Sequence, residues 1–128
     1  MVVDTSAIVS VLLKEADARP LIRKLYRAHS RQISAVSYME SSMVLMSRLG
    51  DNTEGALDGM LQRAKIAIVP VSVDHAKVAV AAFRQYGKGR HPASLNFGDC
   101  FSYALAKSTG EPLLFKGLDF AKTDIAQA

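Results

Sequence analysis

The chain alternates short, continuously apolar runs with longer segments whose apolar residues recur at helical spacing. Val2 and Val3 make the first apolar run, and Asp4 follows them directly. Short apolar runs of this kind predict buried strands, and the others cover residues 32–35, 66–71 and 113–115. The run 66–71 is the clearest, and its continuous apolar character predicts a central strand of a parallel sheet.

The remaining segments predict six helices, at residues 5–13, 15–28, 37–49, 53–64, 75–86 and 96–109. Thr5 or Ser6 is expected to cap the first helix, because hydroxyl side chains accept hydrogen bonds from the free amides of a helix start. Ser37 and Glu40 match the S-x-x-E capping box, which predicts a helix start at Ser37. Gly110 is expected to end the last helix.

Strands that alternate with helices favour a parallel sheet covered on both faces. We therefore expect an α/β fold with a central, mostly parallel sheet flanked by helices. No internal repeat, low-complexity tract or linker divides the chain, so residues 1–128 are expected to form a single domain.

Composition narrows the class of protein. The chain is 49% hydrophobic, which is too apolar for a disordered segment. No apolar run reaches the roughly 18 residues of a membrane span, and no basic region precedes an apolar stretch at the N-terminus. Cys100 is the single cysteine and can form no internal disulfide, which fits a reducing cytoplasm. The net charge of +4 is compatible with a polyanionic partner such as a nucleic acid.

A run of basic residues accompanies the second predicted helix. This run is either an ordinary solvated face or a surface that contacts nucleic acid, and the solvated face is the simpler interpretation. Its members are Arg19, Arg23, Lys24, Arg27 and Arg31.

Four acidic residues stand where strands end or helices begin. Asp4 follows the first strand, Glu40 lies at the start of the third helix, Asp99 opens the last helix and Asp119 follows the last strand. In a parallel sheet these places share one edge. Four carboxylates at one edge repel one another unless a cation lies between them, and a hard divalent cation with oxygen ligands is the natural partner.

Each acid also has a purely structural interpretation. Glu40 and Asp99 each stand three residues after a capping residue and favour a helix start, while Asp119 can be a turn residue. Asp4 is harder to explain in this way, because a carboxylate directly after a buried strand needs a partner. The three histidines, His29, His75 and His91, have no spacing that indicates a metal site.

With these four acids in this order, the chain resembles a known family, the PIN domains, and within it the VapC toxins of bacterial toxin–antitoxin pairs. The resemblance spans almost the whole chain. The residues that carry it are Val3-Asp4-Thr5-Ser6-Ala7, Glu40 in Ser37-Tyr38-Met39-Glu40, Gly87-Lys88-Gly89-Arg90-His91, Asn96-Phe97-Gly98-Asp99-Cys100, and the segment from Leu113 to Phe120.

The resemblance implies a magnesium- or manganese-dependent ribonuclease that a cognate VapB antitoxin inhibits. It implies that Asp4, Glu40 and Asp99 are catalytic metal ligands. Many PIN domains carry a further acid at the position of Gly117, so here Asp119 is the candidate fourth acid, acting through water or through another ligand. The family also implies a homodimer.

Other residues near the same edge are candidates for binding RNA. Thr5 and Ser6 either orient Asp4 or a bound water, or only cap the helix. Lys116 leaves the sheet at the edge of the acids, and Arg90 lies on the loop before Asp99, so both are expected to contact RNA phosphates. Arg84 and Lys88 are weaker candidates.

The helix after Glu40 is rich in methionine and is expected to point mostly inward, as core filler or as part of an apolar interface. These residues are Met39, Met43, Leu45, Met46 and Leu49. Cys100 is expected to be packed rather than reactive.

Three other functions fit parts of the pattern. A receiver-like domain needs an acid at the end of the third strand, and a haloacid-dehalogenase-type phosphatase needs a second aspartate at the position of Ser6; neither is present. A catalytically silent PIN-like module that only binds RNA or a protein is the remaining alternative.

Overall fold

Residues 1–128 are all described by the computed structural model, in which four parallel strands form one sheet in the order β3-β2-β1-β4. The strands are β1 (Val2–Val3), β2 (Gln32–Ser34), β3 (Ala67–Val69) and β4 (Leu113–Leu114). Val2 lies opposite Gln32 on one side and Leu113 on the other. Because all strands run the same way, their C-terminal ends meet at one edge of the sheet.

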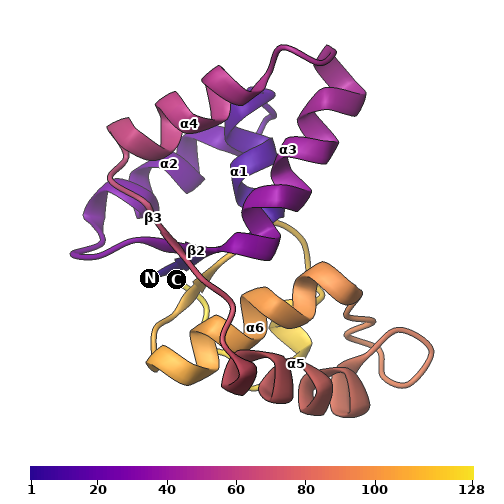
Figure 1. Ribbon diagram of the computed structural model, residues 1–128. Helices are drawn as coiled ribbons and strands as arrows, with labels where there is room; N and C mark the ends of the chain where they lie inside the picture. Colours follow the sequence, from indigo (N-terminus) through magenta and orange to yellow (C-terminus); the bar gives the residue numbers. More distant parts are fainter.

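Six α-helices and one 3-10 turn complete the domain, and Figure 1 shows how the helices lie around the sheet. Helices α1 to α4 cover one face of the sheet, and α5 and α6 cover the other, which confirms the expected α/β fold. The helices are α1 (Thr5–Leu12), α2 (Ala18–Arg27), α3 (Ala35–Leu49), α4 (Glu54–Arg63), α5 (Val73–Tyr86) and α6 (Phe97–Thr109), followed by the 3-10 turn η1 (Phe120–Lys122).

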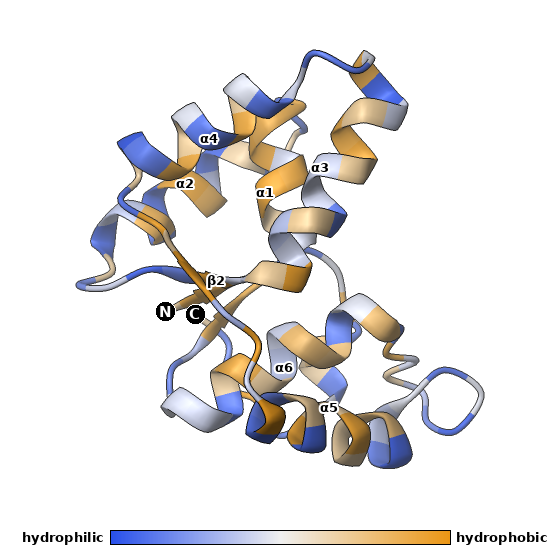
Figure 2. Cartoon of the chain, in the orientation of Figure 1, coloured by the Kyte–Doolittle hydropathy of each residue, from blue (hydrophilic) through white to orange (hydrophobic).

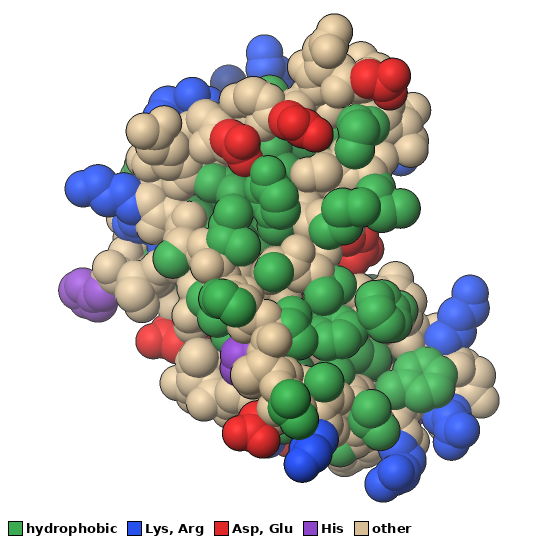
Figure 3. All heavy atoms as spheres, in the orientation of Figure 1, with side chains coloured by type: hydrophobic (Ala, Val, Ile, Leu, Met, Phe, Trp, Pro, Cys, Tyr) green, Lys and Arg blue, Asp and Glu red, His purple; other side chains and the backbone are tan.

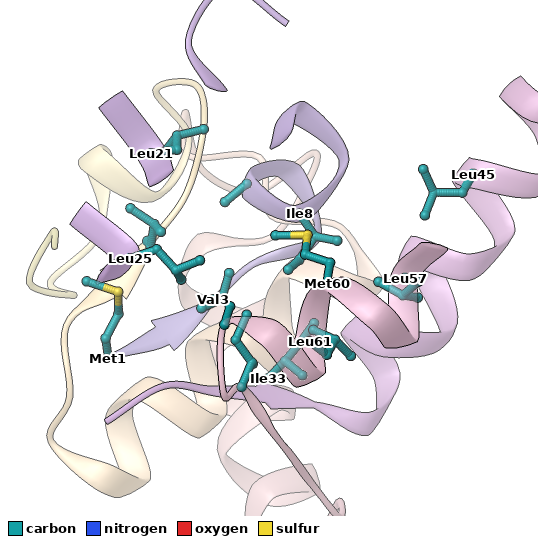
Figure 4. Close-up of a cluster of buried hydrophobic side chains, with 14 residues drawn as sticks. Met1, Val3, Ile8, Leu21, Leu25, Ile33, Leu45, Leu57, Met60 and Leu61 are labelled. Carbon is teal, nitrogen blue, oxygen red and sulfur yellow. The ribbon is translucent and has the colours of Figure 1, made fainter. Parts of the chain in front are cut away.

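The alternation of side chains along the strands divides the core in two. Val3 points into the cluster built by α1 to α4, where Figure 4 shows it near Ile8 and Ile33. Val2, its neighbour, points to the opposite face and packs against α5 and α6. Each fully buried aliphatic side chain of this kind contributes about 1.5–3 kcal/mol, so both layers hold β1 and hence Asp4 in place.

Two helix starts differ from the prediction. Asp4 itself caps α1, with its side chain accepting a hydrogen bond from the amide of Ser6, so the expected cap at Thr5 or Ser6 is wrong. Ser34 caps α3, which begins at Ala35 rather than at Ser37. Ser34 is as suitable a cap as Ser37 and lies directly at the end of β2, so the helix starts there. Glu40 is therefore not part of a capping box.

The segment 66–71 also differs from the prediction. It forms β3, which is an edge strand and not a central one, and both Ala67 and Ile68 are exposed. Figure 2 shows this strand apolar along much of its length. A continuous apolar run therefore does not require burial on both faces; here the run leaves an apolar surface at the sheet edge.

The prediction that the methionine-rich helix points mostly inward is wrong for three of its five large apolar side chains. Met39 and Met43 are 57% and 54% exposed, and Leu49 is exposed as well, while Leu45 is buried. The inward face of α3 is built instead from small hydroxyl residues, Ser37, Ser41 and Ser42, together with Leu45. Small side chains let α3 approach its neighbours closely, and Met39 and Met43 are left on the outer surface.

The rest of the chain follows the prediction closely. The second helix begins at Ala18, three residues later than expected. Asn96 caps α6, and Gly110 ends it in the left-handed conformation expected of a C-terminal glycine. None of the helices has the length and apolar character needed to cross a bilayer.

Candidate active site

Asp4 lies at the C-terminal end of β1 and is almost completely buried, with 3% of its surface exposed. Its Oδ1 accepts a hydrogen bond of 2.6 Å from the Ser102 hydroxyl, which comes from α6. Its Oδ2 accepts bonds from the Ser6 amide, at 2.9 Å, and from the Ser6 hydroxyl, at 2.6 Å. Three donors therefore hold this carboxylate in one orientation.

Glu40 reaches the same region from α3. Its carboxylate lies against the backbone of Gly98 at the start of α6, so close that a Cβ atom on residue 98 would overlap it. Burial raises the pKa of Glu40, and the negative charge of Asp4 raises it further. The carboxylate of Glu40 is thus half-buried beside a second acid.

Asp99 lies one residue after Gly98 and forms a capping box with Asn96. The Asp99 carboxylate accepts from the Asn96 amide, and the Asn96 side chain accepts from the Asp99 amide, each at 2.9 Å. Burial raises the pKa of Asp99 to about 7, and the charges of Asp4, Glu40 and Asp119 act in the same direction. Asp99 therefore has both the expected capping role and a place among the other acids.

Asp119 is the outermost of the four. It is exposed, it precedes η1 without forming a side-chain cap, and its charge raises the pKa of Asp99 less than those of Asp4 and Glu40 do. Gly117, two residues earlier, has a φ of +97°, a conformation that side-chain-bearing residues rarely adopt. An acid at position 117 would strain this backbone, which is consistent with an acid at 119 instead.

The donor set is suited to a hard cation. The three acids Asp4, Glu40 and Asp99 offer carboxylate oxygens alone, and the charge of Asp4 raises the pKa of the other two. In this arrangement, however, no group of three or more histidine, cysteine or acidic side chains is gathered tightly enough to enclose a metal ion. Magnesium does not require such a cage, because it usually binds through one or two carboxylates and keeps several waters.

Two of the three histidines accept hydrogen bonds from nearby backbone amides, and the cysteine is packed in the core. His75 accepts from the Ser72 amide at the start of α5, and His91 accepts from the Ala93 amide. Cys100 is buried, and burial followed by the charge of Asp99 raises its pKa to about 11. At neutral pH this thiol is protonated and is not a nucleophile.

A groove opens beside the acids, between the first turns of α3 and α6. It has a volume of about 550 Å³ and includes Glu40 and Gly98 in a mainly apolar lining that contains Met39 and Met43. Phe97 is 73% exposed and separates this groove from a wholly apolar pocket of about 390 Å³ between α5 and α6. Figure 3 shows hydrophobic side chains gathered over this part of the surface.

The basic residues near the site are engaged in different ways. The Lys116 ammonium lies 2.5 Å from Glu15 and 3.5 Å from Asp17, and its backbone amide donates to the Ser6 hydroxyl. The Arg90 guanidinium stacks over Phe83, 5.5 Å from the ring centre. Lys116 is thus at the expected edge but already paired, whereas Arg90 is exposed on the loop.

The basic run of the second helix divides in two. Arg31 is not part of a solvated face, since it donates to the backbone carbonyls of Leu25, Tyr26 and Ala28 at the end of α2 and to that of Ala64 at the end of α4. Arg19, Arg23 and Arg27 are exposed, and no arginine in the chain takes part in a salt bridge.

Sequence reasoning missed three residues of this site: Ser37, Ser102 and Gly98. Ser37 lies three residues before Glu40, and Ser102 lies three residues after Asp99, so each shares a helix face with an acid. That spacing was a usable signal. The role of Gly98 depends on which helices approach each other, and the residues next to it in the sequence do not indicate that contact.

Comparison with known proteins gives a consistent result. The family model for the PIN domain matches residues 1–126. The chain is 51% identical to Ribonuclease VapC30 of Mycobacterium tuberculosis over 126 residues, covering 98% of this chain and 96% of the relative. It is also 51% identical to Ribonuclease VapC of Mycolicibacterium smegmatis, covering 98% of both.

Solved structures agree on the fold. Mycobacterium tuberculosis VapC20, described as a Sarcin-Ricin loop cleaving toxin, matches with a TM-score of 0.80 at 17% identity, over 99% of this chain and 97% of that one. A toxin–antitoxin complex from Klebsiella pneumoniae contains a chain that matches with a TM-score of 0.69 at 19% identity, over 96% and 92%.

Proposed function

Because the chain belongs to the PIN domain family and, within it, to the VapC ribonucleases, we propose that Asp4, Glu40 and Asp99 form the catalytic centre of a magnesium-dependent ribonuclease toxin. The observation that carries the proposal is the convergence of these three acids at the sheet edge, where burial first, and then the charges of Asp4 and Glu40, raise the pKa of Asp99 to about 7. Acids that disturb one another in this way at a strand edge are typical of a functional site.

Each acid has a separate task in this proposal. Asp4, oriented by three donors, together with Glu40 and Asp99 would hold Mg²⁺, with Mn²⁺ as a substitute, and Asp119 would act through water or another ligand. A divalent cation at this place supplies charge neutralisation at a phosphodiester and makes water a better nucleophile. The Asn96 amide holds the Asp99 carboxylate in the capping box at the start of α6.

The residues around the acids would bind the RNA. The chain carries a net charge of +4, so a polyanion is attracted to it despite the acids. Lys116, at the edge of the acids, and Arg90, exposed on the loop before α6, would contact phosphates, Lys116 by exchanging its bond with Glu15 for one with RNA. Ser6 links the two functions, since its hydroxyl donates to Asp4 and accepts from the Lys116 amide.

The test is cleavage of cellular RNA by the purified protein. We expect cleavage with magnesium, loss of cleavage in EDTA, and recovery when magnesium is added back in excess. RNA that binds the protein but stays intact with magnesium or manganese would contradict the proposal and favour the silent RNA-binding module. Sequencing the cleaved ends then identifies the RNA target. Groove shape and a few base contacts would set this specificity, and no residue pattern in the chain names the target.

The exposed apolar surface beside the acids is a candidate for partner binding. We propose that a segment of a VapB-type antitoxin binds the groove with Met39 and Met43, because methionines adapt to varied apolar partners. A second copy of the chain would cover the outer face of α5, where Val80 and Phe83 are exposed. Light scattering should give a dimer at micromolar concentration and a monomer for Val80→Asp, with the exposed Ala56→Asp as control.

A monomeric wild-type protein would contradict the dimer without affecting the proposed catalysis. Antitoxin binding is tested separately, by co-purification with the product of a small reading frame next to this gene. Met43→Asp should then weaken that complex while Ala56→Asp leaves it intact.

A further inference from the structure

Two buried serines lie beneath the acids, and their hydroxyl groups contact only Asp4 and each other. Ser37 and Ser102 are both 0% exposed. Their hydroxyl oxygens are 2.9 Å apart, and the Ser102 hydroxyl lies 2.6 Å from Oδ1 of Asp4. We infer that Ser37 and Ser102 form a hydroxyl relay that orients Asp4 for cation binding and ties α3 to α6, and that both are positioning residues.

The direction of the relay follows from the number of protons. An ionised carboxylate only accepts, so Ser102 must give its single hydroxyl proton to Asp4. The proton between the two serines therefore belongs to Ser37, which donates to Ser102. A hydroxyl that accepts one bond donates the next one more strongly, so Ser37 strengthens the bond that Ser102 makes to Asp4.

The relay also leaves Asp4 with a single free direction. A carboxylate has about four lone-pair sites. Ser102 occupies one site on Oδ1, and the amide and hydroxyl of Ser6 occupy both on Oδ2. The remaining site is on Oδ1, beside the Ser102 bond, so Ser102 decides where a cation can approach Asp4.

The placement of the serines couples the relay to the other two acids. Ser37 and Glu40 are three residues apart on α3, and Asp99 and Ser102 are three residues apart on α6. Residues at this spacing lie on one helix face. The hydrogen bond between the serines therefore fixes α3 against α6 one turn below Glu40 and Asp99, which sets how these two carboxylates face each other.

The other buried serines of the same helix show what a purely structural serine does. Ser41 is also 0% exposed, but its hydroxyl donates to the backbone carbonyl of Ser37, one turn earlier in α3. Ser42 bonds the carbonyl of Tyr38 in the same way. The hydroxyls of Ser37 and Ser102 bond a hydroxyl and a carboxylate instead.

The inference rests on the proposed function, because it concerns cation binding by Asp4, and its test uses binding rather than catalysis. Binding of Mn²⁺ to the full chain is measured by electron paramagnetic resonance for wild type, Ser102→Ala, Ser37→Ala, the double variant and Ser41→Ala. Groups that orient a metal ligand typically change metal affinity by about 10–100-fold. We expect a loss of that size for Ser102→Ala and a smaller loss for Ser37→Ala.

Two further comparisons between variants distinguish a hydroxyl relay from a general loss of packing around the site. The double variant should bind Mn²⁺ no more weakly than Ser102→Ala, because Ser37 acts only through Ser102. Ser41→Ala removes an equally buried hydroxyl from the same helix and should leave Mn²⁺ affinity unchanged. Ser37→Ala serves as the primary variant if Ser102→Ala does not fold.

The outcomes distinguish the two proposals. Wild-type Mn²⁺ affinity in folded Ser102→Ala and Ser37→Ala would overturn the relay and leave the proposed ribonuclease intact. An equal loss in Ser41→Ala would also overturn the relay, since the effect would then come from packing of α3. A wild-type protein that binds no Mn²⁺ would overturn the proposed metal centre itself, and the relay with it.

Discussion

Gly98 on α6 lies directly against the carboxylate of Glu40 on α3, so that any side chain at residue 98 would occupy the space of that carboxylate. The contact brings the starts of two helices together that are more than fifty residues apart in the chain. It lies at the end of the groove beside the acids, where a missing side chain leaves room for Glu40 to reach Asp4.

We predict that Gly98→Ala impairs catalysis but not folding. The added Cβ would displace the end of the flexible Glu40 side chain, and misplacing a catalytic group by about 1 Å can cost about 100-fold in rate. Alanine in a helix is also about 1 kcal/mol more favourable than glycine, so stability should not fall. RNA cleavage rates and urea unfolding would measure both effects.

Gly55→Ala is the matched control for this substitution. Gly55 lies in α4, and a Cβ atom there would meet nothing within 4 Å. It should gain similar stability and keep wild-type activity. A Gly98→Ala protein that cleaves as fast as Gly55→Ala would show that the position of Glu40 does not matter for catalysis.

The raised pKa of Asp99 predicts that the metal-free protein loses stability as pH rises. The folded protein holds a proton on Asp99 up to a pKa of about 7, whereas the unfolded chain releases it near the ordinary value of 3.8. The folded state therefore binds more protons between these values, and the free energy of unfolding falls with rising pH across this window and is level above it. Because Asp99 is partly exposed, we expect a loss on the order of 1 kcal/mol between pH 5 and pH 8.

Asp99→Asn should remove part of this pH dependence. Asparagine keeps a side-chain acceptor for the Asn96 amide but carries no charge, so in EDTA at pH 8 the variant should be more stable than wild type. Glu40 retains its own raised pKa and keeps some slope in the variant. Urea unfolding at both pH values measures the effect, with the exposed Asp51→Asn as control. A variant less stable than wild type at pH 8 would mean that Asp99 acts mainly as a helix cap.

Lys116 and Arg90 are predicted to contribute to RNA affinity through phosphates. Each alanine substitution should weaken binding similarly for different RNA sequences and reduce the slope of log affinity against log salt by about 0.7–1. The effect of Lys116→Ala should be the smaller, because its ammonium must first leave Glu15 and Asp17. Binding is measured in EDTA, so that RNA stays intact.

Lys107 offers a control for this measurement. Like Lys116 it is half-exposed and forms a salt bridge, here with Asp124 at 2.6 Å, but it lies in the last turn of α6, away from the acids. Lys107→Ala should change the salt slope less than Arg90→Ala does. Equal slopes for all three variants would mean that the positive charges act only through the net charge of the protein.

Much of the fold and the main acids could be predicted from the sequence, because they depend on local patterns. Asp4 directly after a buried strand, and Asp99 three residues after Asn96, are recognisable from neighbouring residues alone. The prediction that residues 66–71 form a central strand was wrong, because strand order is decided by packing between distant segments. An apolar run has the same pattern at the centre of a sheet and at an exposed edge.

The predictions of the capping residue and of the inward face of α3 were wrong for a related reason. Ser34 and Ser37 are both suitable caps, and the end of β2 decides between them. Methionine is more hydrophobic than serine, yet the close approach of α3 to α6 requires the small serines inside and leaves Met39 and Met43 outside. That requirement comes from the second helix and cannot be read from the sequence of α3.

The most direct test of the account is RNA cleavage at saturating magnesium by Asp4→Asn, Glu40→Gln and Asp99→Asn, with Asp51→Asn as the matched exposed control. Circular dichroism establishes that each variant is folded. We predict that the first three abolish cleavage, that Asp119→Asn has a milder effect, and that Asp51→Asn cleaves like wild type. Wild-type cleavage by a folded Asp99→Asn protein would contradict the assignment of these acids as the catalytic centre.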